Sequence, residues 1–369
     1  MHSFRAISAK VFHGSGLNSN KVINILRIHE NTNNCFKYSS TKAAVCHQKN
    51  EPLKVEDVKE KKLKKGEVKI KVKYCALNPR DLQLVLGHVD EKLPFVPGYE
   101  VSGEIIERYE DDKEVPFEIG DKVIALTKSS LGGLSSHCIA EEEDVWKYQS
   151  LDPKVAAGLI VNYGHSLLSL FRRAKIKKNM TVLVTSDSGG LGLAALDIAA
   201  NVYKAKVVGV CGSELKADVM REKGAWSALK MDIANMKASV QDITGGKGVD
   251  VVYDTVGRDF LKGAVQCVKH EGIVILADVP GHEDLIKPIE LFNLDTFNLT
   301  AVTLNHYRQH DLPVYRQVVS DVIELCEQSL ISPHVSQTFD LEHVNEAVQL
   351  LQQDQIIGKI LVKLPSTKH

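Results

Sequence analysis

The stretch Thr181-Val-Leu-Val-Thr-Ser-Asp-Ser-Gly-Gly-Leu-Gly192 decides the fold of this 369-residue chain. Its first five residues are mostly apolar and predict a short buried strand, and a helical stretch at 191–203 follows the glycines. Glycines at such a turn permit a tight bend and let backbone N–H groups approach a pyrophosphate at the positive end of the helix. Only the trailing half of the full GxGxxG pattern, Gly189 and Gly192, is present. We expect this turn to bind a dinucleotide, against the alternative of a plain turn, through Ser188, Gly189, Gly190, Leu191 and Gly192.

The sequence that follows this turn continues to alternate strands and helices. Further apolar runs lie at 206–211, 248–254 and 272–277, and helical stretches lie between them at 214–223 and 260–268. Because these runs are apolar throughout, they predict a parallel sheet that is covered on both faces. We therefore predict an α/β protein whose residues 165–305 form a Rossmann domain with a doubly wound parallel sheet.

Residues 41–164 have a different pattern, with short β-type runs that Gly and Pro interrupt. The runs at 67–73, 101–106 and 121–126 predict an antiparallel barrel or sandwich. Beyond residue 305 the sequence predicts helices at 314–327 and 341–352 and a final strand at 358–364. Since this tail is short and mixed, we expect residues 306–369 to return and complete the domain that residues 41–164 begin.

The residues after the second strand indicate which dinucleotide is bound. NAD specificity usually needs an Asp or Glu at the end of this strand, where the carboxylate binds the ribose hydroxyls. Here the strand ends in Gly212 and Ser213, which leave room for a 2′-phosphate, and Ser213 and Lys216 are candidates to bind that phosphate. Glu214 competes with this interpretation, although it stands where the next helix opens, and Lys216 is alternatively an ordinary surface lysine. We predict NADP(H) rather than NAD.

The composition excludes several classes of partner. The formal net charge is −1, so there is no electrostatic reason to expect nucleic acid or acidic lipid. No apolar run approaches the roughly 18–20 residues of a membrane span. The seven cysteines are dispersed and form no CxxC motif, which fits a reducing compartment better than a disulfide framework.

The first 40 residues have the composition of a targeting segment. They contain five Lys and Arg residues but only one acid, Glu30, among many Ser and Asn residues. We predict that residues 1–38 are a mitochondrial transit peptide, that the mature chain starts near residue 39, and that it resides in the matrix. The alternative is a disordered extension that carries no address.

The sequence offers no pattern typical of a metal site. His137 and Cys138 are adjacent and lack metal-ligand spacing, and there is no P-loop or nucleophile elbow. Without a metal to polarise a simple carbonyl, a hydride transferase is better suited to acceptors that delocalise the incoming charge. This points to quinones or α,β-unsaturated carbonyls (enones) as small-molecule substrates.

A family resemblance rests on eight stretches in chain order. They are Cys75–Asp81, Pro94–Gly103, Gly120–Ile124, Val161–Gly164, Val182–Gly192, Asn201–Val207, Val251–Gly257 and Gly358–Val362. With them, residues 43–364 resemble the medium-chain dehydrogenases/reductases, in the quinone oxidoreductase group. The resemblance implies a GroES-like β-barrel domain split around a Rossmann domain, NADPH as cofactor, and homodimers.

The resemblance also implies roles for particular residues. Asn78 and Asp81 would lie by the nicotinamide and the substrate, with Asn78 donating to the developing enolate or quinol oxygen. Alternatively, Asn78 forms the turn before Pro79, and Asp81 caps the following helix. Tyr163 would line the cleft or, alternatively, be a buried core tyrosine. The resemblance further implies that Thr255 and Val256 contact the cofactor.

Zinc-containing relatives carry a ligand Cys where this chain has Asn78 and a ligand His where it has Tyr99. The resemblance therefore disfavours a zinc alcohol dehydrogenase, and the main hypothesis is a zinc-free NADPH-dependent reductase. The rival is a catalytically impaired reductase-fold protein with a binding or regulatory role. This alternative rests on four positions around the expected cofactor site where the residue differs from the one usual in the group: Asp187, Met231, Arg258 and Asp278.

Overall fold

The computed structural model describes residues 40–109, 116–127, 131–186, 189–230, 232–277, 296–353 and 356–365. The chain divides into two units, residues 1–40 and residues 41–369, and the fold below is that of the second. The predicted transit peptide lies outside the described residues, as do Asp187, Ser188, Met231 and Asp278. The side chain of Arg258 lies outside them as well.

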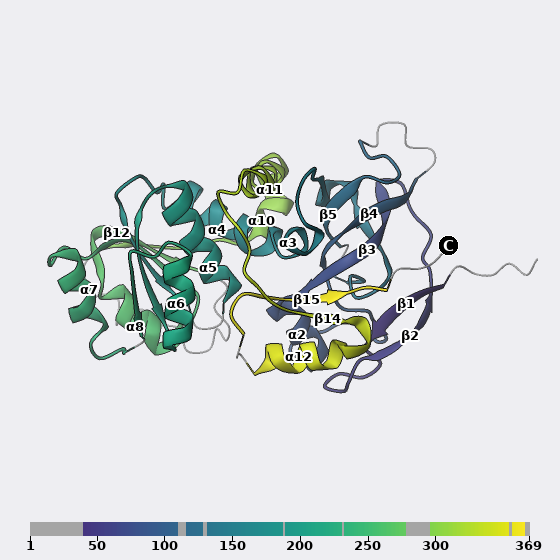
Figure 1. The fold of residues 1–369 in the computed structure, drawn as a ribbon, viewed down its shortest axis with the longest axis horizontal. Helices are drawn as coiled ribbons and strands as arrows, with labels where there is room; N and C mark the ends of the chain where they lie inside the picture. Colours follow the sequence, from purple (N-terminus) through teal and green to yellow (C-terminus); the bar gives the residue numbers. More distant parts are fainter. Residues whose placement is uncertain are drawn as a thin grey trace, which may run out of the picture. The chain divides into compact units, whose positions relative to one another are not determined.

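A six-stranded parallel sheet forms one part of the unit (Figure 1). Its strands are β8 (Thr181–Thr185), β9 (Lys206–Cys211), β10 (Ser227–Lys230), β11 (Val249–Asp254), β12 (Val268–Leu276) and β13 (Asn298–Ala301). Their order in the sheet is β10-β9-β8-β11-β12-β13, so the winding direction reverses between β8 and β11. This is the doubly wound order that the sequence predicts, and ligands of such sheets bind outside the carboxyl ends of the strands at the reversal.

Successive side chains of a strand point to opposite faces of the sheet. Because these strands are largely apolar, both faces of the sheet are apolar. In β8, Val182 and Val184 join a core cluster with residues of α5 (Gly190–Asp197) and α6 (Glu214–Glu222). Leu183 joins a separate cluster with residues of α7 (Met236–Thr244) and α8 (Arg258–Val265). Each such buried side chain contributes about 1.5–3 kcal/mol relative to an exposed one, so helices on both faces stabilise the sheet.

Two predicted helices differ from the observed ones at their boundaries. The helix expected at 191–203 begins at Gly190 and continues beyond Asp197 as a π-helical segment, η5 (Ile198–Val202). The helix expected at 260–268 ends at Val265, and Val268 already belongs to β12, so that boundary is wrong. The sequence misleads here because Leu261, Val265 and Val268 keep the spacing of one helix face, so the apolar pattern does not mark the end of the helix.

A seven-stranded sheet forms the other part of the unit. Its members are β3 (Glu67–Leu77), β4 (Glu100–Arg108), β5 (Lys122–Leu126), β6 (His137–Glu141), β7 (Val145–Lys147), β14 (Val335–Asp340) and β15 (Lys359–Lys363). All pairs are antiparallel except β14 with β15. Strand β15 lies beside β3, with Ile360 opposite Leu77, so the tail returns to the first sheet as the sequence predicts (Figure 1). Strands β1 (Ser40–Val45) and β2 (Lys54–Lys59) form a separate two-stranded sheet.

The remaining helices connect or cover the two sheets. They are α2 (Pro79–Leu86), α3 (Pro153–Ala157), α4 (His165–Leu168), α10 (Leu304–His310), α11 (Leu312–Glu327) and α12 (Val344–Gln352), with the π-helical segments η3 (Ile160–Gly164) and η4 (Ser169–Arg173) and the 3₁₀ turns η2 (Glu142–Asp144) and η7 (Leu341–His343). Residues of α12 pack in the core of the seven-stranded sheet, whereas Tyr315 and Val319 of α11 share a core with the parallel sheet.

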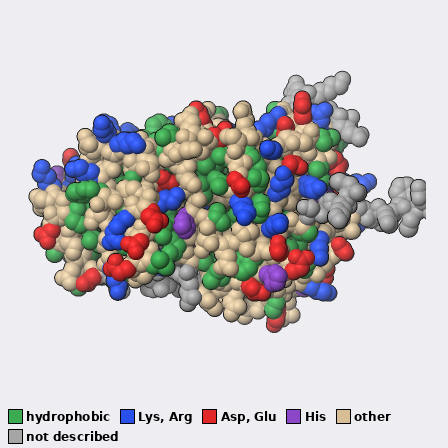
Figure 2. Space-filling view, in the orientation of Figure 1, with side chains coloured by type: hydrophobic (Ala, Val, Ile, Leu, Met, Phe, Trp, Pro, Cys, Tyr) green, Lys and Arg blue, Asp and Glu red, His purple; other side chains and the backbone are tan. Residues whose placement is uncertain are grey.

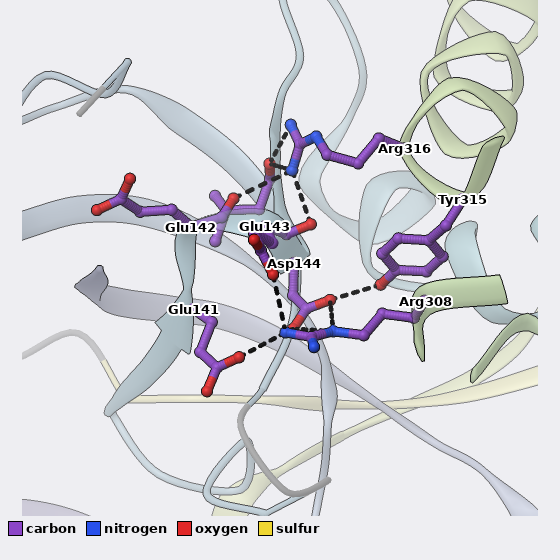
Figure 3. Close-up of polar contacts among 8 residues, drawn as sticks. Glu141, Glu142, Glu143, Asp144, Arg308, Tyr315 and Arg316 are labelled. Atoms are coloured by element: carbon purple, nitrogen blue, oxygen red, sulfur yellow. Dashed lines mark hydrogen bonds and ion pairs between the residues drawn. The ribbon is translucent and has the colours of Figure 1, made fainter. Parts of the chain in front are cut away.

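A polar cluster ties η2 to α10 and α11 (Figure 3). The carboxylate of Asp144 accepts from the Tyr315 hydroxyl at 2.7 Å and from the guanidinium of Arg308 at 3.1 Å. Arg316 donates to the backbone carbonyls of residues 142, 143 and 145. Since a buried carboxylate is costly unless it is paired, these donors hold the turn against the helices.

The surface mixes both signs of charge. On the face drawn in Figure 2, Lys and Arg side chains are interspersed with Asp and Glu side chains. Among the residues that the structure describes, no helix is long and apolar enough to cross a membrane.

Candidate cofactor and active site

The glycine turn between β8 and α5 is shaped for close approach. A Cβ on Gly192 would lie 2.5 Å from the Cβ and Oγ atoms of Ser186, so only glycine lets the helix begin this close to the end of the strand. A Cβ on Gly190 would lie 2.2 Å from Nδ2 of Asn162. A Cβ on Gly189 would lie 3.6 Å from the backbone nitrogen of Leu191. Because Gly189 has no Cβ, the space in front of the first N–H groups of α5 stays open. These N–H groups are suited to bind a pyrophosphate.

The end of β11 lies beside this turn, since Asp254 is paired with Thr185 of β8. The buried Asp254 carboxylate accepts from the Thr185 hydroxyl and from the backbone N–H of Gly257 at 2.8 Å. Burial raises the pKa of Asp254, and these donors act in the opposite direction. The Thr255 hydroxyl donates to the Thr185 carbonyl at 2.8 Å. These contacts fix the segment that carries Thr255 and Val256 at the carboxyl end of the sheet, where the glycine turn begins.

The end of β9 carries the residues expected to select the dinucleotide. The Ser213 hydroxyl accepts from the backbone N–H of Lys216 at 3.3 Å and caps α6. Glu214 is the first residue of α6 and lies 3.9 Å from Arg221, so the prediction that it opens the helix is confirmed. Strand β9 is the parallel neighbour of β8. Gly212, Ser213 and Lys216 therefore lie at the same carboxyl end of the sheet as the glycine turn. The described residues of the predicted cofactor site therefore come together at the reversal of the sheet.

Asn78 belongs to a buried polar cluster with Glu100 and Lys359. These residues are 1%, 0% and 4% exposed. The Lys359 ammonium donates to Glu100 Oε2 at 2.8 Å and to Asn78 Oδ1. Asn78 Nδ2 donates to Glu100 Oε2 at 3.1 Å and, over a longer 3.4 Å, to the Ala76 carbonyl. An acceptor oxygen would therefore reach the Asn78 amide only in exchange for the Ala76 contact.

Asp81 makes contacts typical of a helix cap. Its carboxylate accepts from the backbone N–H groups of Asn78 and Gly98, each at 2.9 Å. Burial raises the pKa of Asp81 to about 7, and these two donors oppose the rise. Both carboxylate oxygens thus have protein partners, in line with the capping interpretation.

Tyr163 is 2% exposed within the core that α11 shares with the parallel sheet. Its hydroxyl lies 2.6 Å from Asp197 Oδ2 and 2.7 Å from the Ser332 carbonyl. Burial, together with the Asp197 charge, raises the pKa of Tyr163. This is the position of a buried core tyrosine, the second of the two interpretations that the sequence left open.

Sequence reasoning missed Glu100, Lys359 and Asn162. Their one signal is that each stands in a stretch that carries the family resemblance, at 94–103, 161–164 and 358–362, although nothing there marks the individual residue. Glu100 and Lys359 lie 259 residues apart in the chain, so no local pattern pairs them. Among the described residues there is no group of three or more His, Cys, Asp or Glu side chains that could hold a metal ion.

Comparisons with known proteins agree with this architecture. Residues 64–164 match the family model for the alcohol dehydrogenase GroES-like domain, and residues 190–325 match that for zinc-binding dehydrogenase. Among solved structures, a mycobacterial protein complexed with NADPH has a TM-score of 0.80 at 22% identity, over 88% of this chain and 100% of that one. The human synaptic vesicle membrane protein VAT-1 homolog-like protein has a TM-score of 0.76 at 26% identity, over 89% and 99%.

Curated relatives define the family. Quinone oxidoreductase-like protein 2 of Bos taurus is 32% identical over 326 residues, which cover 88% of this chain and 92% of that protein. Human quinone oxidoreductase is 28% identical over 309 residues, 82% of this chain and 90% of that protein. With the doubly wound sheet and the GroES-like match, these identities confirm the predicted fold and resemblance. The chain belongs to the quinone oxidoreductase group of the medium-chain dehydrogenases/reductases, and it is an oxidoreductase-family protein with a nicotinamide-cofactor fold.

Proposed function

We propose that the chain is a zinc-free NADPH-dependent reductase of quinones or α,β-unsaturated carbonyls. The observation that carries this proposal is the glycine turn at the reversal of the parallel sheet, where Gly192 permits contact with Ser186 and Gly189 leaves the first N–H groups of α5 accessible. When bound, NADPH supplies a hydride from the nicotinamide to a conjugated acceptor.

The chain's own residues would bind and orient the cofactor. The N–H groups of Gly190, Leu191 and Gly192 begin α5 and would donate to the pyrophosphate. Ser213, which caps α6, and Lys216 in its first turn would bind the 2′-phosphate. This role fits the lack of an acidic residue at positions 212 and 213, directly after β9. Thr255 and Val256, fixed through Asp254, would border the nicotinamide half.

On the acceptor side, Asn78 remains the candidate donor to the developing oxygen charge. A donor that is already oriented when charge develops costs no reorganisation at that moment. The contacts to Glu100 and Lys359 would orient the amide, and the long Ala76 contact is the one that an acceptor would replace.

The proposal is tested by titrating the chain from residue 39 with NADPH and NADH, followed by turnover against a panel of quinones and enones. Tight NADPH binding with turnover of at least one class of acceptor is the expected result. Binding without turnover across the panel would reject the reductase activity.

One observation favours a second candidate, a dinucleotide-binding protein without turnover. Asn78, Asp81 and Tyr163 are each at most 2% exposed, and each has protein partners for its polar atoms. A chain with this enclosed arrangement would bind NADPH and act through a partner protein. Asn78→Ala separates the candidates, since it lowers turnover in the reductase, whereas a pure binding protein has no turnover to lose.

Two further parts of the proposal concern the cellular setting. We propose that residues 1–38 direct the chain to the mitochondrial matrix, which N-terminal sequencing of the chain recovered from mitochondria tests. We also propose a homodimer. Among the described strands β13 is at the edge of the parallel sheet and exposes Leu299, a feature suited to strand pairing between copies, and light scattering tests the mass.

A further inference from the structure

Lys359 and Glu100 form the most enclosed ion pair between described residues, with side chains 5% and 0% exposed. Their N–O distance is 2.8 Å. A buried pair of this kind adds little net stability compared with apolar side chains of the same size, because both charges lose their hydration. Its specific effect is to favour one arrangement of the groups around it.

That arrangement is the orientation of the Asn78 amide. The Lys359 ammonium has only donors, so it fixes Oδ1 of Asn78 on its side. The Glu100 carboxylate has only acceptors, so it fixes Nδ2 on the other side. A flipped amide would bring like groups together at both ends, and the pair therefore permits a single orientation.

One link runs from this pair to the glycine turn through the chain itself. Gly358 precedes Lys359 and is bridged to Gly189 in parallel. Gly358 has a φ of +92°, and a Cβ there would lie 2.1 Å from the His334 carbonyl oxygen. Only glycine fits at position 358. Lys359 therefore directly follows the residue that is bridged to the glycine turn.

A second link runs through Glu100. Its Oε1 accepts from the backbone N–H of Val161 at 2.9 Å. The side chain of the next residue, Asn162, occupies the space where a residue other than glycine at position 190 would place its Cβ. Each member of the ion pair thus connects separately to the turn that the dinucleotide would occupy.

We infer that Lys359 and Glu100 are a positioning pair that couples dinucleotide binding at the glycine turn to the setting of the Asn78 amide. The identity of the ligand, a pyrophosphate-containing dinucleotide, rests on the proposed function. The pair acts through Asn78, the turn and the intervening backbone.

The test uses the double variant Lys359→Met/Glu100→Gln in the full chain. Both replacements are close in length to the originals, neither charge is left unpaired, and Gln keeps an oxygen that accepts from Val161. A control is Lys69→Met, because Lys69 of β3 is another buried lysine, 8% exposed and paired with Glu60 at 3.2 Å and with Glu107. Lys359→Arg is a second variant that retains the charge but replaces the ammonium by a planar fork.

Two readouts are measured, the NADPH dissociation constant by calorimetry and hydrogen exchange of the Val161 amide with and without NADPH. In the wild type, NADPH should slow this exchange by about tenfold, within the usual range of coupling between sites. The double variant should lose this protection and bind NADPH about tenfold more weakly, since coupling is reciprocal. The Lys69→Met control should behave as the wild type.

Wild-type affinity and protection in the double variant would overturn the inference while leaving the proposed function intact. If the double variant does not fold, the same two readouts on Lys359→Arg decide, with unchanged affinity and protection counting against the pair. A wild-type chain that binds neither NADPH nor NADH overturns the proposed function, and the inference with it.

Discussion

Gly189→Ala tests the geometry of the phosphate site most sharply. Among the described residues, the atom nearest to the new methyl is Ser186 Oγ at 3.5 Å, an ordinary contact. The φ of Gly189 is −101°, which alanine adopts readily. The free energy of unfolding should therefore stay within about 0.5 kcal/mol of the wild type, as for substitutions that create neither clash nor cavity.

Binding should respond differently. The methyl would lie 3.6 Å from the Leu191 nitrogen and 3.7 Å from the Gly192 nitrogen, in the space where a phosphate oxygen would accept from both N–H groups. Loss of one charged hydrogen bond costs about 1.5–3 kcal/mol. We expect the NADPH dissociation constant to rise by about 10-fold to 150-fold, at 1.4 kcal/mol for each tenfold step.

The assay is calorimetric titration with NADPH, together with thermal unfolding of each variant. Gly263→Ala is the control, since Gly263 lies in α8 and its added Cβ would meet only side chains at 3.4 Å. Gly189→Ala with wild-type affinity would show that the pyrophosphate does not bind at this turn. A large loss of stability in Gly189→Ala would refute the argument from open space.

Three further predictions concern single sites. Lys216→Ala should weaken NADPH binding by about tenfold and leave NADH binding unchanged, because only the 2′-phosphate would contact the ammonium; equal losses for both nucleotides would contradict this. Tyr163→Phe should lower the free energy of unfolding by about 1–3 kcal/mol through the lost contact with Asp197, while kcat for any acceptor falls less than about twofold; a selective loss of kcat would instead put the hydroxyl in the cleft. The folded pKa of Asp81, about 7, exceeds its ordinary 3.8, so its contribution to stability is fully present below about pH 4 and lost as pH rises through about 7. Urea unfolding across this range should show the decline in the wild type and not in Asp81→Asn, and parallel curves would exclude Asp81 as its source.

The parallel sheet could be predicted from the sequence because its signals are local. The runs at 181–185, 206–211 and 249–254 are short and apolar. The glycines at 189–192 indicate that a tight turn into a helix follows the first of them. The residues at the carboxyl ends of those strands were brought together by topology alone. Thus most of the expected cofactor site needed no knowledge of tertiary contacts.

The surroundings of Asn78 could not be predicted in this way. The amide was expected to face an acceptor, whereas Glu100 and Lys359 enclose it from strands that are distant in sequence. The same holds for Tyr163, because its partner Asp197 follows an apolar helical run and gives no sign of which hydroxyl it accepts from. Buried polar pairing depends on which elements become neighbours, and periodicity carries no such information.

The central claim is that this fold holds NADPH at the glycine turn of the parallel sheet. Its most direct test is a titration of the chain from residue 39 with NADPH and with NADH, followed by nicotinamide fluorescence. We predict saturable NADPH binding that is at least about tenfold tighter than NADH binding, as a 2′-phosphate site requires. No saturable binding of either nucleotide by the folded protein would contradict the account.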